Sequence, residues 1–430
     1  MNKEMIKNQS TLVKNIEFLD SIKILNEGIK AADPESCLKP FFSKNQIKIK
    51  RSVINLKQFD NVYIISIGKA SDIMAKFVSK KVDFKHGLVV MPASYKSVFS
   101  NKKIQFIKSG HPLPNKQSVR AAMHLEKLVL NTNKNDFIIF LISGGGSALV
   151  SHPMGISLEE KIALNNALIH SGANINEISC VRKHLSEIKG GKLLQKMRCG
   201  GVSLVMSDVI GDDLSSISSG LTFADNTTFS QALKILKKYK IQNKVSKNVI
   251  NVLKMGTKKK FFETPKKPVI KNIIIGNNTK CLLAMKKKSE SMNYNVSTIY
   301  DINTDVKITA KKIIKTLVNT KNNCLIFGGE PTVKVTGNGK GGRNQELVLL
   351  LLKGLKKYSN FIISSIATDG IDGNTQFAGA IISSKRILPF EPYLKNNNSF
   401  SFYKKFGGLI KTGPTHTNMN DVGLIIKQNL

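Results

Sequence analysis

The chain has 430 residues, which exceeds what one hydrophobic core usually supports, so we expect at least two domains. Hydrophobic residues make up 41% of the sequence, enough to build ordinary cores, and this excludes a disordered protein. The formal net charge is +37, but lysines occur in nearly every segment without clustering, so nucleic acid is not an expected partner. A generally positive surface favours the approach of small anions such as nucleotides and carboxylates.

The five cysteines are widely spaced and form no CxxC pair, which argues against both a disulfide framework and a zinc site. The first 14 residues lack the apolar stretch of a signal peptide. No run approaches the ~18 apolar residues that a membrane span needs. We therefore expect a cytoplasmic enzyme that contacts no membrane and works as a monomer or homodimer.

Short apolar segments alternate with amphipathic ones along the chain, which is typical of parallel strands covered by helices. The expected strands are 62–67, 87–91, 137–142, 203–206, 272–275, 324–327 and 361–366. The expected helices include 69–80, 117–130, 158–170 and 345–355. A lysine-rich stretch at 255–267 predicts a surface connection, and glycine clusters after Leu325 indicate a second domain. The fold class is α/β.

A glycine-rich segment, Ser143-Gly144-Gly145-Gly146-Ser147, follows an apolar strand and precedes an expected helix. Glycines there let backbone N–H groups approach a phosphate closely. The segment matches neither the phosphate-binding GxxxxGK[ST] loop nor the dinucleotide GxGxxG motif. A tight strand-to-helix turn that needs glycine only for packing is the alternative.

Charged residues follow two other expected strands. Lys69 opens a helix directly after strand 62–67, where its ammonium group could meet phosphate or carboxylate oxygens. Asp208, Asp212 and Asp213 follow strand 203–206, where carboxylates could hold a hydrated Mg²⁺ or accept a hydroxyl proton. A solvated lysine and capping of the next helix by Asp212 or Asp213 are the alternatives. Asp208, nearest the strand end, is the preferred candidate.

A compact basic cluster, Arg182-Lys183-His184, lies in helical surroundings just before Lys189. These groups could bind a carboxylate or phosphate of a nucleotide or substrate. A solvated helix face is the alternative, particularly for Lys183 and Lys189.

The C-terminal region adds a third set of candidate binding residues. Arg343 stands at the start of an expected helix, where a cation opposes the helix dipole, so its position indicates an anionic partner. Asp369 and Asp372 lie on a glycine-rich turn after strand 361–366, without the spacing of a calcium-binding EF-hand. The remaining candidates near these turns are Glu330, Asn344 and Glu346.

Together these segments resemble the glycerate 2-kinase family over most of the chain. The segments that carry the resemblance are Gly68-Lys69-Ala70, Ser109 to Pro114, Ser143 to Ala148, His170 to Ala173, Val181 to Leu185, Lys189-Gly190-Gly191, Ser207 to Asp213, Gly329-Glu330, Gly341 to Glu346, Thr368 to Gly373, Thr412 to Thr415, Asn418 and Asp421. The resemblance implies a larger N-terminal Rossmann-like domain (1–255), a connecting α/β segment (256–320) and a smaller C-terminal MOFRL domain (321–430), with a cleft between the domains.

The resemblance also implies an ATP- and Mg²⁺-dependent phosphorylation of D-glycerate to 2-phosphoglycerate. Lys69 and Arg343 match positions of catalytic basic residues in the family, and Asp208 matches an acidic residue near the reaction centre. Without the resemblance, the choice between the 2- and the 3-hydroxyl stays open. Leu221, Asn226 and His416 depart from the family pattern. These changes alter loop rigidity more than charge, so we expect them to affect substrate affinity more than the chemical step.

Two other function classes compete with the kinase. A hydroxypyruvate reductase would need a nicotinamide site, and the sequence has no strand–GxGxxG–helix fingerprint followed by an acidic residue. A non-enzymatic anion-binding protein would be favoured if the carboxylates and Arg343 did not converge.

Overall fold

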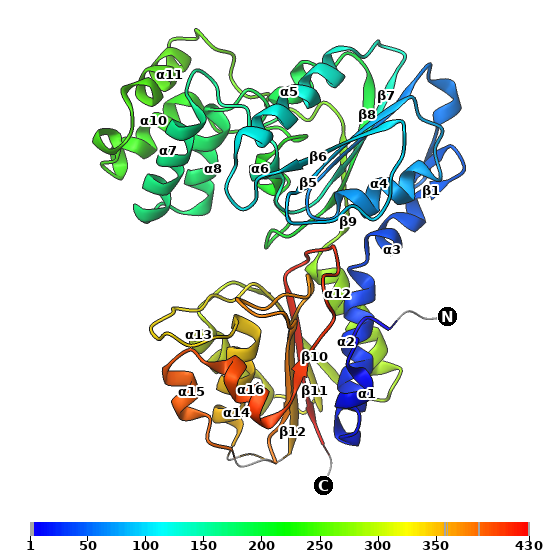
Figure 1. The fold of residues 1–430 in the computed structure, drawn as a ribbon, viewed down its shortest axis with the longest axis vertical. Helices are drawn as coiled ribbons and strands as arrows, with labels where there is room; N and C mark the ends of the chain where they lie inside the picture. The colour runs from blue at the N-terminus through cyan, green and yellow to red at the C-terminus, as the bar shows by residue number, and fades with distance from the viewer. Residues whose placement is uncertain (1–3, 357, 359, 386–387, 429–430) are drawn as a thin grey trace. The chain divides into compact units, whose positions relative to one another are not determined.

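The computed structural model describes residues 4–428 except 357, 359 and 386–387. The chain forms two compact units. We call Leu38–Ile275 the parallel-sheet unit, and we call Met1–Cys37 with Gly276–Leu430 the mixed-sheet unit (Figure 1). The expected boundaries at 255 and 320 differ from this division, because residues 256–275 belong to the parallel-sheet unit and residues 276–320 to the mixed-sheet unit. The N-terminal segment also packs with the C-terminal half.

The parallel-sheet unit is built on a six-stranded sheet with the strand order β6-β5-β4-β7-β8-β9. Its strands are β4 (Val62–Ile67), β5 (His86–Pro92), β6 (Ile104–Ser109), β7 (Phe137–Ile142), β8 (Gly200–Met206) and β9 (Lys271–Gly276). Neighbours from β6 through β8 run parallel. Every residue of β4 and β7 is buried, as expected of central strands covered on both faces. A separate three-stranded antiparallel sheet contains β1 (Phe42–Ser43), β2 (Gln46–Ile49) and β3 (Ser52–Asn55).

Helices cover this sheet and extend beside it. They are α4 (Ser71–Ser79), α5 (Lys116–Leu130), α6 (Gly146–Leu149), α7 (Leu158–His170), α8 (Ile175–His184), α9 (Lys192–Gln195), α10 (Phe229–Lys238) and α11 (Lys247–Thr257). The buried face of α5 packs on alternate residues of β4, β5 and β7. Helices α7, α8, α10 and α11 gather in a group with its own hydrophobic core (Figure 1).

The mixed-sheet unit has a second six-stranded sheet, with the order β10-β11-β15-β12-β13-β14. Its strands are β10 (Val296–Ile302), β11 (Cys324–Gly329), β12 (Phe361–Ala367), β13 (Gly379–Ser383), β14 (Leu409–Ile410) and β15 (Asp421–Lys427). Only the pair β10–β11 is parallel among the described strand pairs of this sheet. The last strand of the chain therefore lies between β11 and β12, antiparallel to both.

Helices cover both faces of this mixed sheet, with α2 and α12 on one side and α13, α14 and α16 on the other (Figure 1). The helices are α1 (Gln9–Leu12), α2 (Leu19–Ala31), α12 (Asn278–Glu290), α13 (Val306–Asn319), α14 (Arg343–Leu355), α15 (Glu391–Lys395) and α16 (Ser399–Phe406), with α3 (Pro34–Leu38) at the boundary between the units. The Ser21 hydroxyl on α2 lies 2.8 Å from the Ser364 hydroxyl on β12, which ties the N-terminal segment to this sheet.

Five short 3-10 helices complete the described elements: η1 (Ile16–Phe18), η2 (Lys39–Phe41), η3 (Leu56–Gln58), η4 (Ile217–Ser219) and η5 (Gln242–Lys244). Within the described residues, no helix combines the length and the apolar character needed to cross a membrane.

All seven expected strands and all four named helices are confirmed, with boundaries that shift by a few residues. The strands that were not expected include β6 and β15. The strand β6 is an edge strand with half-buried and exposed positions, so it lacks a continuous apolar run. The strand β15 begins with an aspartate and contains Gly423, where a Cβ would lie 2.4 Å from the Phe327 ring.

Candidate active site

Three of the sequence-predicted residues meet at one edge of the parallel sheet. Ile67 of β4 pairs with Ile142 of β7, and Ile142 pairs with Val205 of β8, so these neighbouring strands end level with one another. The residues that follow them, Lys69, Ser143 and Asp208, therefore emerge at the carboxyl edge. Ligands of open α/β sheets bind at this edge.

The turns after β4 and β7 are joined by hydrogen bonds. The Lys69 N–H donates to the Gly144 carbonyl at 2.9 Å, and the Ala70 N–H donates to Ser143 Oγ at 3.1 Å. Gly68 has a φ of +131°, and a Cβ there would lie 2.1 Å from Ser143 Oγ. Glycine at position 68 is thus required both by the backbone angle and by the close approach of the second turn.

The side chains of Asp208, His111 and Lys69 converge on the glycine loop. A Cβ on Gly144 would lie 2.1 Å from Asp208 Oδ2. A Cβ on Gly145, which has a φ of +88°, would lie 2.9 Å from His111 Cδ2 and 3.6 Å from Lys69 Cγ. The loop thus lies against a carboxylate, an imidazole and the side chain of a lysine, a combination suited to proton transfer beside an anion.

The imidazole of His111 was not predicted from the sequence, because it follows the unrecognised edge strand β6. Burial lowers the pKa of His111, and the positive charge of Lys69 lowers it further. The imidazole is therefore neutral at pH 7, where it can donate through one nitrogen and accept through the other.

Asp212 and Asp213, the expected metal ligands, lie on the turn that precedes η4. Asp213 Oδ1 accepts from the Ser215 N–H at 2.9 Å, and Asp213 Oδ2 accepts from the Ser215 and Ser216 hydroxyls at 2.8 and 2.6 Å. Both oxygens of Asp213 thus accept hydrogen bonds within the turn, while Ser216 is the N-cap residue of η4. No group of three or more His, Cys, Asp or Glu side chains placed to hold a metal ion occurs among the residues that the structure describes.

The three basic residues at the end of α8 differ in their partners: two bind other side chains within the unit, and one does not. Lys183 Nζ forms a buried ion pair with Asp225 Oδ1 at 3.3 Å. His184 is fully buried, with Nδ1 2.8 Å from the Cys180 carbonyl and Nε2 3.1 Å from Glu263 Oε2. Both residues hold the helical group together. Of the three, only Arg182 has a side chain that makes no hydrogen bond or ion pair with any described residue.

Ser147 and Lys189 connect the glycine loop to the segment that contains η4. Ser147 Oγ lies 2.8 Å from Ser219 Oγ. Lys189 Nζ donates to the carbonyls of Gly146 and Ser218, both at 3.1 Å, and its side chain is only 2% exposed. A solvated helix face, considered for Lys189 from the sequence, is therefore wrong. The tertiary contact that buries this lysine has no local sequence signal.

Arg343 is the centre of a second candidate set, in the mixed-sheet unit. Its Nε and Nη2 donate to the two oxygens of Asp421 at 2.6 and 3.1 Å, and Nη1 donates to Glu330 Oε1 at 2.9 Å. Burial would lower the pKa of Arg343, but the two carboxylates raise it, so the guanidinium stays charged. Burial raises the pKa of Asp421 against the effect of Arg343, and the bidentate contact is that of an ionised carboxylate.

The anionic partner expected for Arg343 is thus supplied by the chain itself. Three of its five N–H donors are engaged, and the side chain remains 30% exposed. Two donors remain for a ligand, but the adjacent carboxylates offset the positive charge. Arg343 is suited to orient an anion through hydrogen bonds more than to neutralise it.

The other C-terminal candidates have internal partners. Asp372 is buried and accepts from the backbone N–H groups of Asn344 and Gln345 at 3.0 and 2.9 Å, so it caps α14 and positions Arg343. Asn344 is fully buried and also donates to Asp372. Glu346 Oε2 accepts from Asn397 at 3.0 Å, and Asp369 Oδ1 accepts from the Ile371 N–H at 3.0 Å.

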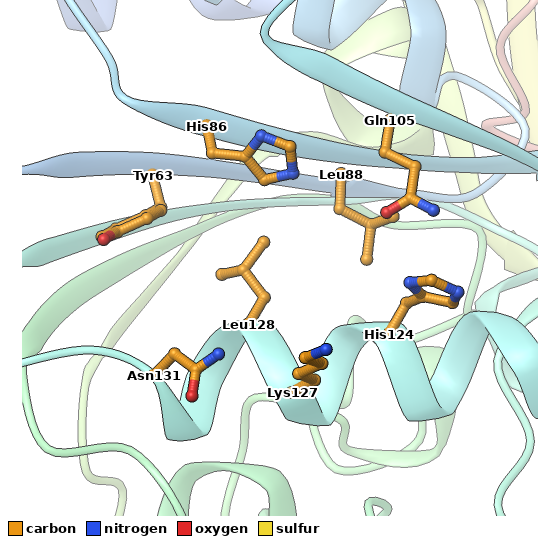
Figure 2. Close-up of a pocket in the computed structure, with 8 residues that line it drawn as sticks. All are labelled: Tyr63, His86, Leu88, Gln105, His124, Lys127, Leu128 and Asn131. Atoms are coloured by element: carbon orange, nitrogen blue, oxygen red, sulfur yellow. The ribbon is translucent and has the colours of Figure 1, made fainter.

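A cavity of about 290 Å³ lies away from the glycine loop, beside the C-terminal half of α5 (Figure 2). Tyr63 and His86, which stand near the amino ends of β4 and β5, are among its lining residues. The cavity therefore does not belong to the carboxyl edge where Lys69 and Asp208 meet.

Comparison with known proteins places the chain in a family. A domain of unknown function, DUF4147, matches residues 20–254, and the MOFRL family matches residues 323–421. The chain is 34% identical to a glycerate 2-kinase from Pyrococcus horikoshii, over 94% of this chain and 96% of the relative. It is 36% identical to a D-glycerate 2-kinase from Thermotoga maritima, over 94% of this chain and 98% of the relative.

A solved structure of a glycerate kinase from Thermotoga maritima has the same fold, with a TM-score of 0.83 and 33% identity over 97% of this chain and all of that one. Similarity in sequence and in fold thus extends over both units. The chain belongs to the glycerate 2-kinase family, with a DUF4147 domain followed by a MOFRL domain.

Proposed function

We propose that this protein transfers a phosphoryl group from ATP to the 2-hydroxyl of D-glycerate, giving 2-phosphoglycerate and ADP. The convergence of Lys69, Asp208 and the glycine loop at one sheet edge is the observation that carries the proposal. Relatives named as glycerate 2-kinases over almost the whole chain support the choice of substrate.

In this reaction Asp208 orients the attacking hydroxyl and accepts its proton as the new O–P bond forms. The bond between the transferred phosphorus and its bridging oxygen breaks, and ADP leaves with the electron pair. Lys69 offsets the negative charge of the phosphoryl oxygens, and the backbone N–H groups of the glycine loop donate to anionic oxygens. Arg343, in the mixed-sheet unit, keeps two N–H donors, which we assign to an anionic group of a substrate.

Mg²⁺ is part of the proposal, because it neutralises charge on nucleotide phosphates when bound. Magnesium usually takes one or two protein carboxylates together with phosphate oxygens and water, so a cluster of three side chains is not required. Asp212 and Asp213 remain the candidate ligands, and Asp213 would have to give up hydrogen bonds within the turn before η4 to bind the ion. We also expect the enzyme to work in the cytoplasm.

A coupled assay of ADP release with D-glycerate, ATP and Mg²⁺ tests the proposal, and phosphorus NMR identifies the product. We expect turnover to 2-phosphoglycerate by the wild type and its near-complete loss in Lys69→Ala. Lys80→Ala, which removes an exposed lysine at the far end of α4, is the matched control and should keep full activity. Absence of ADP release above background in the wild type would refute the kinase, and NADPH oxidation with hydroxypyruvate would be tested next.

A further inference from the structure

Four basic side chains of the parallel-sheet unit are near enough for their charges to act on one another. Lys161 comes from α7, Arg182 from α8, Lys189 from the turn before α9, and Lys192 from the start of α9. The three lysines are 5%, 2% and 6% exposed, while Arg182 is half-buried. We call these residues the buried cation cluster.

The members of the buried cation cluster differ in whether their side chains have hydrogen-bond partners. Lys189 donates to two backbone carbonyls, and Lys192 Nζ donates to the Ser186 carbonyl at 2.9 Å and lies 5.3 Å from the centre of the Phe229 ring. The side chains of Lys161 and Arg182 make no hydrogen bond or ion pair with any residue in the described part of the chain. Two basic side chains are therefore withdrawn from water without a protein partner.

The charge of the cluster is also uncompensated by direct contact. Within residues 4–428, gaps excepted, no carboxylate forms an ion pair with any of the four. Burial lowers the pKa of Lys161 to about 7, and the charges of Arg182 and Lys192 contribute. Burial likewise lowers the pKa of Lys189, with contributions from Lys161 and Arg182. A buried basic group without a partner weakens the fold whether it stays charged or loses its proton, so its presence indicates a function that requires it.

The cluster is directly connected to the proposed active site. Lys189 Nζ binds the carbonyl oxygen of Gly146, the last glycine of the loop on which Lys69 and Asp208 converge. Arg182, the most exposed member, has a planar guanidinium with five N–H donors, which matches the geometry of phosphate oxygens. Lys189 thus links the buried cation cluster to the glycine loop, and Arg182 is the member most accessible to a ligand.

We propose that the buried cation cluster binds the phosphate groups of the nucleotide, with Arg182 and Lys161 as the direct ligands. This inference rests on the proposed kinase function. Several positive charges at one place suit a polyphosphate, whereas the single charge of a glycerate carboxylate would leave most of them unpaired. An anion beside Lys161 favours its charged form, so nucleotide binding should take up a proton.

The decisive variant is Lys161→Met, which keeps most of the side-chain volume and removes the unpartnered amine. Titration calorimetry with ADP and with D-glycerate, in two buffers of different ionisation enthalpy at about pH 7.5, measures both affinity and proton uptake. We expect the Kd for ADP to rise roughly tenfold or more, as for loss of a charged hydrogen bond, and the proton uptake to disappear. D-glycerate should bind as in the wild type. Lys254→Met removes an exposed lysine on α11 and should change none of these values.

A thermal melt of the same variants separates binding from folding. The melting temperature of Lys161→Met should equal or exceed that of the wild type, because a buried amine without a hydrogen-bond partner has been replaced by an apolar side chain. A lower melting temperature would assign Lys161 a structural role and overturn the proposal. Unchanged ADP affinity would overturn it as well, and weakened D-glycerate binding with intact ADP binding would overturn the assignment to phosphate.

Arg182→Gln provides a second variant at a half-exposed position, and it should weaken ADP binding in the same way. These binding measurements do not require turnover. A wild type that binds ADP with proton uptake but releases no ADP from ATP would refute the proposed function and leave the phosphate site standing. An active wild type whose Lys161→Met and Arg182→Gln variants bind ADP normally would refute only the phosphate site.

Discussion

A Cβ atom on Gly144 would lie 2.1 Å from Oδ2 of Asp208, so the backbone of the glycine loop and this carboxylate are in direct contact. Any side chain at position 144 must displace either the loop or Asp208. This contact fixes where the proposed proton acceptor stands relative to the backbone amides of the loop.

Gly144→Ala should therefore impair catalysis while the fold is retained. We expect kcat/KM to fall about a hundredfold, as for a catalytic group misplaced by roughly an ångström. Steady-state kinetics and a circular dichroism melt measure the two effects. Gly200→Ala is the matched control, because its Cβ would make only ordinary contacts with Phe137 at 3.5 Å. Equal kinetic losses in both variants would show that the Asp208 contact is not the cause.

Asp208→Asn should abolish most of the chemical step without disturbing substrate binding. The amide is nearly isosteric with the carboxylate but cannot accept the hydroxyl proton, and general-base catalysis contributes roughly 10²–10⁴ in rate. We expect kcat to fall within that range and KM for D-glycerate to stay within a few-fold of the wild type. A kcat near that of the wild type would exclude Asp208 as the proton acceptor.

The His111 imidazole should report on the charge of Lys69. Because burial and the Lys69 charge both lower the pKa of His111, Lys69→Met should raise that pKa toward its ordinary value of 6.5. A pH titration of the imidazole carbon-bound protons by NMR measures the shift, with Lys80→Met as the control. In the wild type, the unfolded state binds the proton more readily, so this histidine lowers stability as the pH falls below about 6.5. An unshifted pKa in Lys69→Met would contradict the contact around Gly145.

The ion pair between Lys183 and Asp225 should matter for stability and not for substrate affinity. Both side chains are almost fully buried, at 3% and 2% exposure, so Asp225→Asn leaves an uncompensated ammonium group and should cost about 3 kcal/mol or more in the free energy of unfolding. Urea denaturation measures this loss. Adding Lys183→Met in the same chain should recover much of it, since the unpaired charge is removed. If Asp225→Asn instead raised KM for a substrate without changing stability, Lys183 would be assigned to substrate binding, as expected from the sequence.

Asp421→Asn, which changes the main partner of Arg343, should affect both stability and substrate affinity. The bidentate acceptor is weakened, so the guanidinium should lose its fixed orientation, and unfolding should become easier by about 2 kcal/mol, as for a hydrogen bond between charged groups. KM for D-glycerate should rise more than KM for ATP if Arg343 orients the carboxylate. Equal changes in both KM values would contradict that assignment. Arg343→Lys, which keeps the charge without the planar fork, should show the same selectivity.

Local patterns in the sequence were sufficient for the strands and the turns that follow them. The apolar runs ending at Ile67, Ile142 and Met206 identify buried parallel strands, since only such strands are continuously apolar. Parallel strands end at a common edge, so Lys69, the glycine loop and Asp208 could be expected to meet there. The family and its reaction were likewise indicated by the order of these motifs.

Long-range pairing was decided only by the tertiary structure. Arg343 receives its carboxylate from Asp421, 78 positions away, and Lys161, Arg182 and Lys189 are brought together from separate elements. Local sequence also could not separate Arg182 from Lys183 and His184, whose partners Asp225 and Glu263 lie far along the chain. Periodicity and turn chemistry report on neighbouring residues, whereas burial and charge pairing depend on which distant segments pack together.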